Sequence, residues 1–159
     1  MSSQTKKVYY NTFSSDAAAF YIAGYEGKVT DIGLSKEFYP VYWVFDPNSF
    51  REELNKINEF FEGTRKSFDI PFELEGTDFQ KKVWETISKI PYGETRSYKE
   101  VAIMTQNPNA ARAVGNVCNK NRLFLVVPCH RVVASNSIGG YGGNLDAKRW
   151  LLNLENENK

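Results

Sequence analysis

The sequence has few of the residues that bind metals or form disulfides. Its 159 residues include two cysteines, Cys118 and Cys129, and one histidine, His130. These three residues are too few for a closed structural zinc site, so we expect no metal. The composition allows a Cys118–Cys129 disulfide, but the sequence shows no export signal, and we therefore expect both thiols to be free.

A long apolar run is also missing. No stretch approaches the ~20 residues that cross a bilayer, and the polar start at Met1–Thr5 does not resemble a signal peptide. The hydrophobic share of 42% and the aromatic share of 14% are those of a globular protein. We expect a cytoplasmic protein without a membrane partner.

The formal net charge of +1 hides a difference between the two halves of the chain. Residues 1–74 hold 8 Lys and Arg against 11 Asp and Glu, whereas residues 75–159 hold 12 against 8. A basic C-terminal half favours a polyanion such as DNA as partner. Many ordinary protein surfaces are this basic, so charge alone does not predict DNA binding.

The first 75 residues predict a small α/β scaffold without catalytic residues. The apolar segments 20–25 and 28–34 flank Glu26-Gly27, which fits a two-residue hairpin turn, and 8–10 is a candidate neighbouring strand. We expect these segments to form an antiparallel sheet.

A helix is expected after this hairpin. Asp46-Pro47 is typical of a helix start, and Gly63 is placed where a C-terminal cap belongs. Apolar residues at helical spacing form one face between them: Phe50, Leu54, Ile57 and Phe61. Segment 68–74 fits either a further strand or an extended connector.

We expect two domains, the first over residues 1–75 and the second over residues 76–159. Two capping boxes mark helix starts in the second domain. Thr77 with Gln80 opens one helix, and Ser97 with Glu100 opens another that runs to about residue 104. Pro108 is well placed to start a third helix, which would run to residue 116. Two short helices with a tight break predict a helix-turn-helix, although many such hairpins bind nothing.

The third helix carries one long cation among small residues. Arg112 is surrounded by residues that would let the helix approach a narrow groove: Ala110, Ala111, Ala113 and Gly115. Close packing against another helix in the core explains the same pattern. The sequence pattern by itself leaves both readings open.

The segment 125–133 carries the candidate chemistry. Apolar runs flank Pro128-Cys129-His130, which places a thiol beside the side chain that exchanges a proton near neutral pH. A cysteine thiolate is a nucleophile when a base or positive field supports it. A buried structural cysteine beside a hydrogen-bonded histidine is the alternative, because free cysteine is among the most buried residue types.

The hexapeptide at residues 128–133, Pro-Cys-His-Arg-Val-Val, resembles the active-site signature of the O6-alkylguanine-DNA alkyltransferases, and the resemblance extends from Thr77 to Glu155. It implies an α+β fold: a ribonuclease H-like N-terminal unit with an antiparallel sheet, then a mainly helical domain with a helix-turn-helix. It also implies a monomer that binds double-stranded DNA containing O6-alkylguanine through the minor groove. The alkyl group would pass irreversibly to Cys129, without a cofactor.

The resemblance also implies roles for single residues. Arg112 would replace the flipped nucleotide, Asn121 would be the hinge asparagine between the recognition helix and the cysteine, and Tyr98 would donate a proton or hydrogen bond to guanine N3. The base would be recognised by backbone groups around Cys129 and Val132 and covered by a glycine-rich loop that carries Tyr141 and Gly143.

Glu155 would orient His130 from the last helix. The apolar stripe of that helix consists of Ala147, Trp150, Leu151 and Leu154, and Glu155 falls on or beside this stripe. A buried carboxylate there would need a partner, and His130 is the candidate. Fraying of the last turn, with Glu155 in solvent, is the alternative.

Two other functions remain open at this stage. One is a non-catalytic DNA-lesion binding protein of the alkyltransferase-like type, although those proteins lack the reactive cysteine that this chain has at Cys129. The other is a cysteine hydrolase with a Cys-His-Glu triad.

Overall fold

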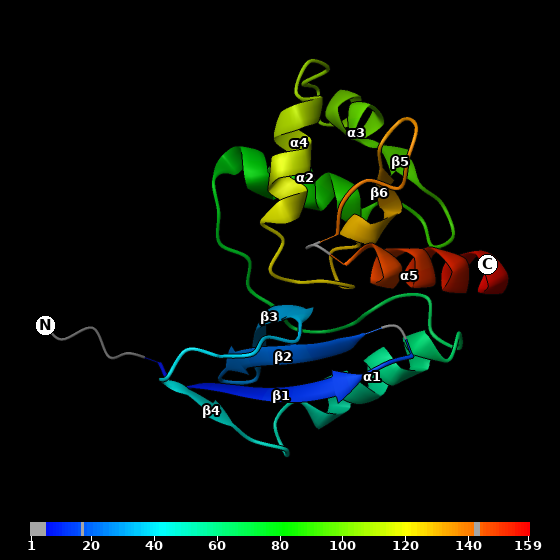
Figure 1. Cartoon of the computed structure of the whole chain (residues 1–159). Coiled ribbons are helices and arrows are strands. Elements are labelled where there is room, and N and C mark those ends of the chain that lie inside the picture. Colours follow the sequence, from blue (N-terminus) through cyan, green and yellow to red (C-terminus); the bar gives the residue numbers. More distant parts are fainter. Residues whose placement is uncertain (1–5, 17, 142–143) are drawn as a thin grey trace, which may run out of the picture.

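The computed structural model describes residues 6–16, 18–141 and 144–159. Its N-terminal part is a four-stranded sheet in the order β3-β2-β1-β4, and the mainly helical C-terminal part lies on the β3 side of that sheet (Figure 1). The strands are β1 (Val8–Ser14), β2 (Ala19–Tyr25), β3 (Lys28–Leu34) and β4 (Trp43–Phe45). The first three strands are antiparallel neighbours, and β4 runs parallel to β1.

The predicted hairpin between β2 and β3 is confirmed. Glu26 and Gly27 have φ values of 51° and 76°. Positive φ at both central residues is what a type I′ turn requires, and its twist matches that of the two strands. The turn between β2 and β3 is therefore specified by two adjacent residues, Glu26 and Gly27.

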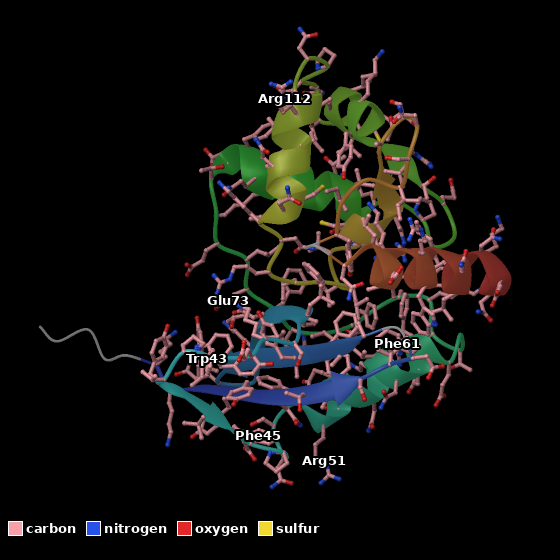
Figure 2. All side chains as sticks on the ribbon, viewed as in Figure 1. Trp43, Phe45, Arg51, Phe61, Glu73 and Arg112 are labelled. Carbon is pink, nitrogen blue, oxygen red and sulfur yellow. The ribbon has the colours of Figure 1, made fainter. Side chains whose placement is uncertain are left out.

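Helix α1 (Arg51–Phe61) starts four residues later than Asp46-Pro47 predicted. The Asp46 carboxylate instead accepts from Asn48 N–H at 2.9 Å, which closes a turn. The helix then packs on the sheet: the Phe61 ring lies 5.8 Å from that of Phe20, between centroids. Figure 2 shows Phe61 on the side of α1 that faces the rest of the protein.

The C-terminal part makes the fold α+β. Its helices are α2 (Asp78–Ser88), α3 (Tyr98–Met104), α4 (Ala111–Asn119) and α5 (Leu145–Asn158), and the parallel strands β5 (Arg96–Ser97) and β6 (Val132–Val133) pair between them. Both predicted capping boxes are present, with Thr77 and Ser97 as N-caps. Within the described ranges, no helix is both long and apolar enough to cross a membrane.

Helix α4 differs from its prediction at both ends. It begins at Ala111 instead of Pro108 and extends to Asn119. The residues before it form a turn in which Ala110 N–H donates to the Asn107 carbonyl at 3.0 Å. Pro108 therefore shapes the connection between α3 and α4 and is not the first residue of the helix.

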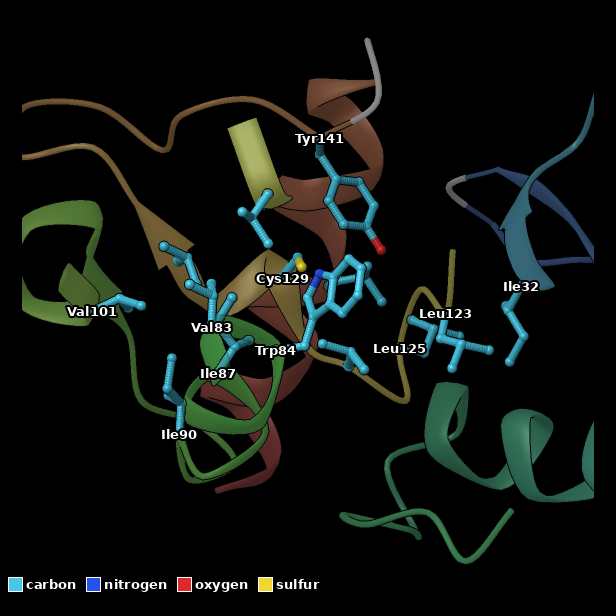
Figure 3. Packing of buried hydrophobic residues seen from close by; sticks show 14 of the residues in the cluster. Ile32, Val83, Trp84, Ile87, Ile90, Val101, Leu123, Leu125, Cys129 and Tyr141 are labelled. Atoms are coloured by element: carbon cyan, nitrogen blue, oxygen red, sulfur yellow. The ribbon is translucent and has the colours of Figure 1, made fainter. Parts of the chain in front are cut away.

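The sheet and the helices are joined at the β3 edge. Ile32 N–H donates to the carbonyl of Arg122 at 2.6 Å, and Phe124 N–H donates back to the Ile32 carbonyl at 3.0 Å. The Arg122 guanidinium also binds both Asp31 carboxylate oxygens, at 2.9 and 3.1 Å. Figure 3 shows Leu123 between Ile32 and the helical core. Residues 122–124, which precede Cys129, are thus hydrogen-bonded to the edge strand of the N-terminal sheet.

Candidate active site

The turn that carries Cys129 is shaped by Pro128. Pro128 has φ −81° and ψ 64°, and Cys129 N–H donates to the Val127 carbonyl at 2.8 Å. These values define an inverse γ-turn, which suits proline because its ring holds φ near this value. The 3-10 turn η1 (Cys129–Arg131) follows, and its three residues per turn point the Cys129 and His130 side chains in different directions.

Asn121 connects the end of α4 to this turn. Its Nδ2 donates to the Cys129 sulfur at 3.1 Å and to the Val127 carbonyl at 2.9 Å. Its Oδ1 accepts from Leu123 N–H at 2.9 Å. Asn121 is buried, and these three bonds hold its amide in one orientation. Asn121, to which the family resemblance assigns the hinge role, therefore lies directly against the sulfur.

His130 and Glu155 meet in the interior. The two side chains are 0% and 2% exposed, and His130 Nε2 lies 2.5 Å from Glu155 Oε2. An ionised carboxylate only accepts, so the proton of the imidazole is on Nε2 and Nδ1 carries the lone pair. Nδ1 has no hydrogen-bond partner within the part of the chain that the structure describes. The solvated alternative for Glu155 is therefore wrong.

Arg131 is a member of this cluster that the sequence did not reveal. Its Nε donates to Glu155 Oε1 at 2.8 Å, its Nη2 to Oε2 at 3.1 Å, and its Nη1 to the Ile90 carbonyl at 2.8 Å. Gly93 N–H adds a further bond to Oε1 at 2.9 Å. The sequence places Arg131 next to His130, but no neighbouring residue in the sequence indicates that the Arg131 side chain is buried.

These contacts set the charges of the cluster. Burial raises the pKa of Glu155, but the hydrogen bonds from His130 and Arg131 and the positive charge of Arg131 outweigh it and lower the pKa to about 2. Burial lowers the pKa of His130 and outweighs the opposing effect of Glu155. Arg131 thus compensates the carboxylate, and His130 is a neutral imidazole at neutral pH, able to accept a proton.

Cys129 itself is a protonated thiol before any reaction. It is 5% exposed, and its hydrogen bond with Cys118, together with burial, holds its pKa well above the usual range. The same hydrogen bond lowers the pKa of Cys118. A nucleophilic Cys129 therefore requires a base to take its proton.

Tyr98 lies at the start of α3, beneath the loop that follows β6. A Cβ added to Gly139, whose φ is 75°, would lie 2.6 Å from the Tyr98 hydroxyl oxygen, so only glycine lets the loop approach this closely. Burial raises the pKa of Tyr98, and the nearby Cys118 thiol raises it further, so the phenol stays protonated at neutral pH. It is therefore able to donate a hydrogen bond.

The other predicted substrate-binding residues are partly placed. Tyr141 is buried, with its ring 4.6 Å from that of Phe124 between centroids, and Figure 3 shows it above Cys129 in the same cluster. Val132 is buried in β6 next to the turn. Gly143 lies outside the described residues.

Lys148 is a second residue that the sequence analysis missed. Its side chain is fully buried, and Nζ donates to the Val132 carbonyl at 2.7 Å and to the Gly140 carbonyl at 3.1 Å. Burial lowers its pKa to about 8, against the raising effect of Cys118 and Cys129. Lys148 is seven residues before Glu155 and lies on the same face of α5. This spacing could have indicated that Lys148 is buried beside the site.

The predicted DNA-contacting residues lie at the start of α4. Arg112 is exposed, and Figure 2 shows it at the end of the protein remote from the sheet. Ala110, Ala111, Ala113 and Gly115 are half-buried. A cleft of about 690 Å³ opens here, bordered by Tyr98, Arg112 and the loop at Ala134–Asn136. Exposure of Arg112 and partial burial of its small neighbours are compatible with both readings of this helix.

In the described portion of the chain, no group of three or more His, Cys, Asp or Glu side chains is placed to hold a metal ion.

Comparison with known proteins places this site in a family. Residues 78–157 match the model of the 6-O-methylguanine DNA methyltransferase DNA binding domain. A methylated-DNA--protein-cysteine methyltransferase of Mycobacterium tuberculosis is 40% identical over 152 residues, which cover 93% of this chain and 92% of the relative. A Methanosarcina barkeri protein of the same name is 39% identical over 95% of this chain and 99% of the relative.

The fold agrees with these sequence relatives. The crystal structure of Mycobacterium tuberculosis O6-methylguanine methyltransferase superposes with a TM-score of 0.89 at 38% identity, covering 96% of this chain and 94% of the other. The structure of the Mycobacterium tuberculosis protein in complex with DNA gives a TM-score of 0.88 at 38% identity, covering 94% of each chain. The chain belongs to the methylated-DNA--protein-cysteine methyltransferase family.

Proposed function

We propose that this protein repairs double-stranded DNA by transferring a methyl or larger alkyl group from O6 of guanine to the sulfur of Cys129, once per molecule. The observation that carries the proposal is the buried Cys129 thiol, held by Asn121 at 3.1 Å beside a neutral His130 whose Nε2 is committed to Glu155. A protein that only bound lesions would have no use for a thiol and a base in this arrangement.

The reaction is a direct displacement. Glu155 fixes the tautomer of His130, and Nδ1 accepts the Cys129 proton through one water molecule. The sulfur then attacks the alkyl carbon, the carbon–oxygen bond breaks, and its electrons pass to guanine O6. Tyr98 donates a proton or hydrogen bond to guanine N3, which makes the base a better leaving group. The thioether has no route back to a thiol, so no cofactor takes part and the molecule reacts once.

The substrate reaches Cys129 from duplex DNA by base flipping. In this proposal α3 and α4 form a helix-turn-helix in the minor groove, and Arg112 occupies the space that the flipped guanine leaves. The exposed position of Arg112 beside the cleft at Tyr98 supports this arrangement. Backbone groups around Cys129 and Val132 would recognise the base, and the loop that carries Tyr141 would cover it.

The scaffold completes the proposal. Residues 1–75 would form a ribonuclease H-like domain, supported by a three-stranded antiparallel meander with a parallel strand beside β1. Residues 76–159 would form the DNA-binding and acceptor domain, and the protein would act as a monomer. In this proposal the N-terminal domain positions the acceptor, because the ion pair between Asp31 and Arg122 holds the segment that leads to Cys129.

The test is incubation with duplex DNA that contains one O6-methylguanine, followed by intact-mass measurement and peptide mapping. We expect each protein molecule to gain the mass of one CH2 group, located on Cys129, while the DNA regains guanine. Unmodified duplex and the Cys129→Ala variant are the controls, and the variant should still bind lesion DNA.

The alternatives give different results in the same experiment. A lesion-binding protein of the alkyltransferase-like type would retain the modified duplex without gaining mass. A cysteine hydrolase would release the radiolabelled methyl group to water with repeated turnover. Either result, or a methyl group mapped to Cys118, would contradict the proposed role of Cys129.

A further inference from the structure

A buried lysine joins two separate segments beside Cys129. Lys148 lies near the start of α5, which passes next to η1 (Figure 1). Lys148 is 0% exposed, and its Nζ donates to the Val132 carbonyl at 2.7 Å and to the Gly140 carbonyl at 3.1 Å. An ammonium group is costly to bury unless hydrogen bonds hold it. The mechanism proposed above assigns no role to this residue.

The first acceptor, Val132, is tied to the turn that carries Cys129. Val132 directly follows η1, and its N–H donates to the Cys129 carbonyl. Val132 also begins β6, where it pairs with Arg96 of β5, two residues before Tyr98. The bond from Lys148 therefore fixes the carbonyl of the residue that connects the acceptor turn to β5.

The second acceptor, Gly140, belongs to the loop that leads to Tyr141. On one side of it, Gly139 lies so close to Tyr98 that an added Cβ would be 2.6 Å from the hydroxyl oxygen. On the other side, Tyr141 is buried in the cluster that contains Cys129. A Cβ added to Gly140 itself would meet no atom within 4 Å, so packing does not hold the loop at this residue. The bond from Lys148 does.

We propose that Lys148 is a positioning residue for alkyl transfer, whose ammonium group holds loop 139–141 at a fixed distance from β6 and so shapes the site that receives the O6-alkylguanine. This role rests on the proposed function, in which the loop covers the guanine. A charged donor makes stronger hydrogen bonds than a neutral one, so the ammonium group restrains both carbonyls firmly. Such restraint matters because a displacement of roughly 1 Å in a reacting site costs ~100-fold in rate.

Two electrophiles separate positioning of the substrate from reactivity of the thiol. O6-benzylguanine has to be seated by its base, whereas iodoacetamide alkylates a thiol without recognition of a base. Both reactions consume the Cys129 thiolate, so the ratio of their rate constants cancels any change in the thiolate fraction. Both rate constants are measured on the full chain by intact mass, and peptide mapping assigns each adduct to Cys129 or Cys118.

The variants are Lys148→Met and Arg149→Met. Lys148→Met keeps an unbranched side chain and removes the charge and the donor. Arg149→Met removes one charge from the neighbouring position of α5, where the side chain is exposed, and is the matched control. Thermal unfolding of each variant shows that the folded protein is compared.

We expect Lys148→Met to lower the ratio of the O6-benzylguanine rate constant to the iodoacetamide rate constant by ~10-fold or more, and Arg149→Met to leave it unchanged. Hydrogen exchange over residues 139–141 should be faster in Lys148→Met alone. An unchanged ratio in Lys148→Met would overturn the proposal, because Lys148 would then act on the thiol or on the fold as a whole. Wild-type protein that transfers nothing from O6-methylguanine duplex would instead contradict the proposed function.

The wild-type protein provides a test that does not depend on a variant. Burial lowers the pKa of Lys148 to about 8, so its charge is present below that pH and is lost as the pH rises through it. The titratable groups that face it are Cys118 of α4 and Cys129 and His130 of η1. We expect the wild-type ratio to fall as the pH rises through 8 and the Lys148→Met ratio to stay constant. A wild-type ratio that is equal on both sides of this pH would also overturn the proposal.

Discussion

Alkylation of Cys129 should destabilise the protein, and the structure indicates why. Cys129 is 5% exposed, and its sulfur accepts a hydrogen bond from Asn121 at 3.1 Å. A methyl group replaces the thiol hydrogen, so extra volume enters a packed region. The Asn121 amide must either tolerate the enlarged group or rotate away from two other bonds.

The size of the effect follows from these changes. Inserting a methylene into a packed core typically costs ~1–3 kcal/mol in the free energy of unfolding. For a chain of this length, 1 kcal/mol corresponds to ~2–4 °C in Tm. We therefore expect methylation to lower Tm by roughly 2–12 °C, and benzylation to lower it further because the added volume is larger.

The strain should reach beyond the turn. Asn121 is followed by Arg122, which binds Asp31, and by residues whose backbone pairs with Ile32 of β3. A displaced Asn121 would therefore weaken the connection between the helices and the sheet. Protection from hydrogen exchange should fall at Ile32 and Phe124 in the alkylated protein before it falls in the centre of the sheet.

The assay is thermal unfolding of free, methylated and benzylated protein, each verified by intact mass. The Cys118→Ala variant, alkylated in the same way, shows how much of the effect depends on the Cys118 side chain, which packs against the same core as Cys129. An unchanged or higher Tm for both adducts would refute the reasoning, because it would mean that the pocket accepts the group without strain.

Three further predictions concern the neighbouring residues. Glu155→Gln should destabilise the fold by ~3–5 kcal/mol at pH 7, because it leaves the buried Arg131 without its counter-charge. The pKa of Glu155 is about 2 in the folded protein against 4.5 normally. The ionised carboxylate therefore contributes its full stabilisation above pH 4.5, and this stabilisation is lost as the pH falls toward 2. The free energies of unfolding of wild type and Glu155→Gln, measured with denaturant, should converge at low pH, and a difference that stays constant with pH would contradict this. His130→Ala and Glu155→Gln should each slow transfer, but the double variant should be little slower than His130→Ala, and strictly additive losses in single-turnover rates would make Glu155 only structural. Arg112→Ala should reduce repair of duplex DNA more than reaction with free O6-benzylguanine, and equal losses on both substrates would mean that Arg112 supports the fold or pocket instead.

Local interactions account for what was predicted correctly about the fold. The Glu26-Gly27 turn and the capping boxes at Thr77 and Ser97 depend on residues within three or four positions of each other, and all three are present. The helix starts at Pro47 and Pro108 were wrong. Proline fits a turn as well as a first helical position, and side-chain contacts such as those of Asp46 decide between them.

The sequence alone determined the candidate chemistry. The hexapeptide around Cys129 indicated the family, and the spacing of the last helix placed Glu155 on the apolar face. The sequence could not decide whether that carboxylate is buried, because the end of a helix either frays or packs according to what lies opposite. Here Gly93, 62 residues earlier in the chain, and the turn at His130 surround it.

Only the tertiary structure revealed the charges around the thiol. Arg131 turns inward to share Glu155 with His130, and Lys148 binds two carbonyl groups beside the site. A charged side chain normally lies in solvent, and its burial depends on partners from distant segments. Periodicity and motifs report one segment at a time, whereas protonation states depend on the whole set of groups that folding brings together.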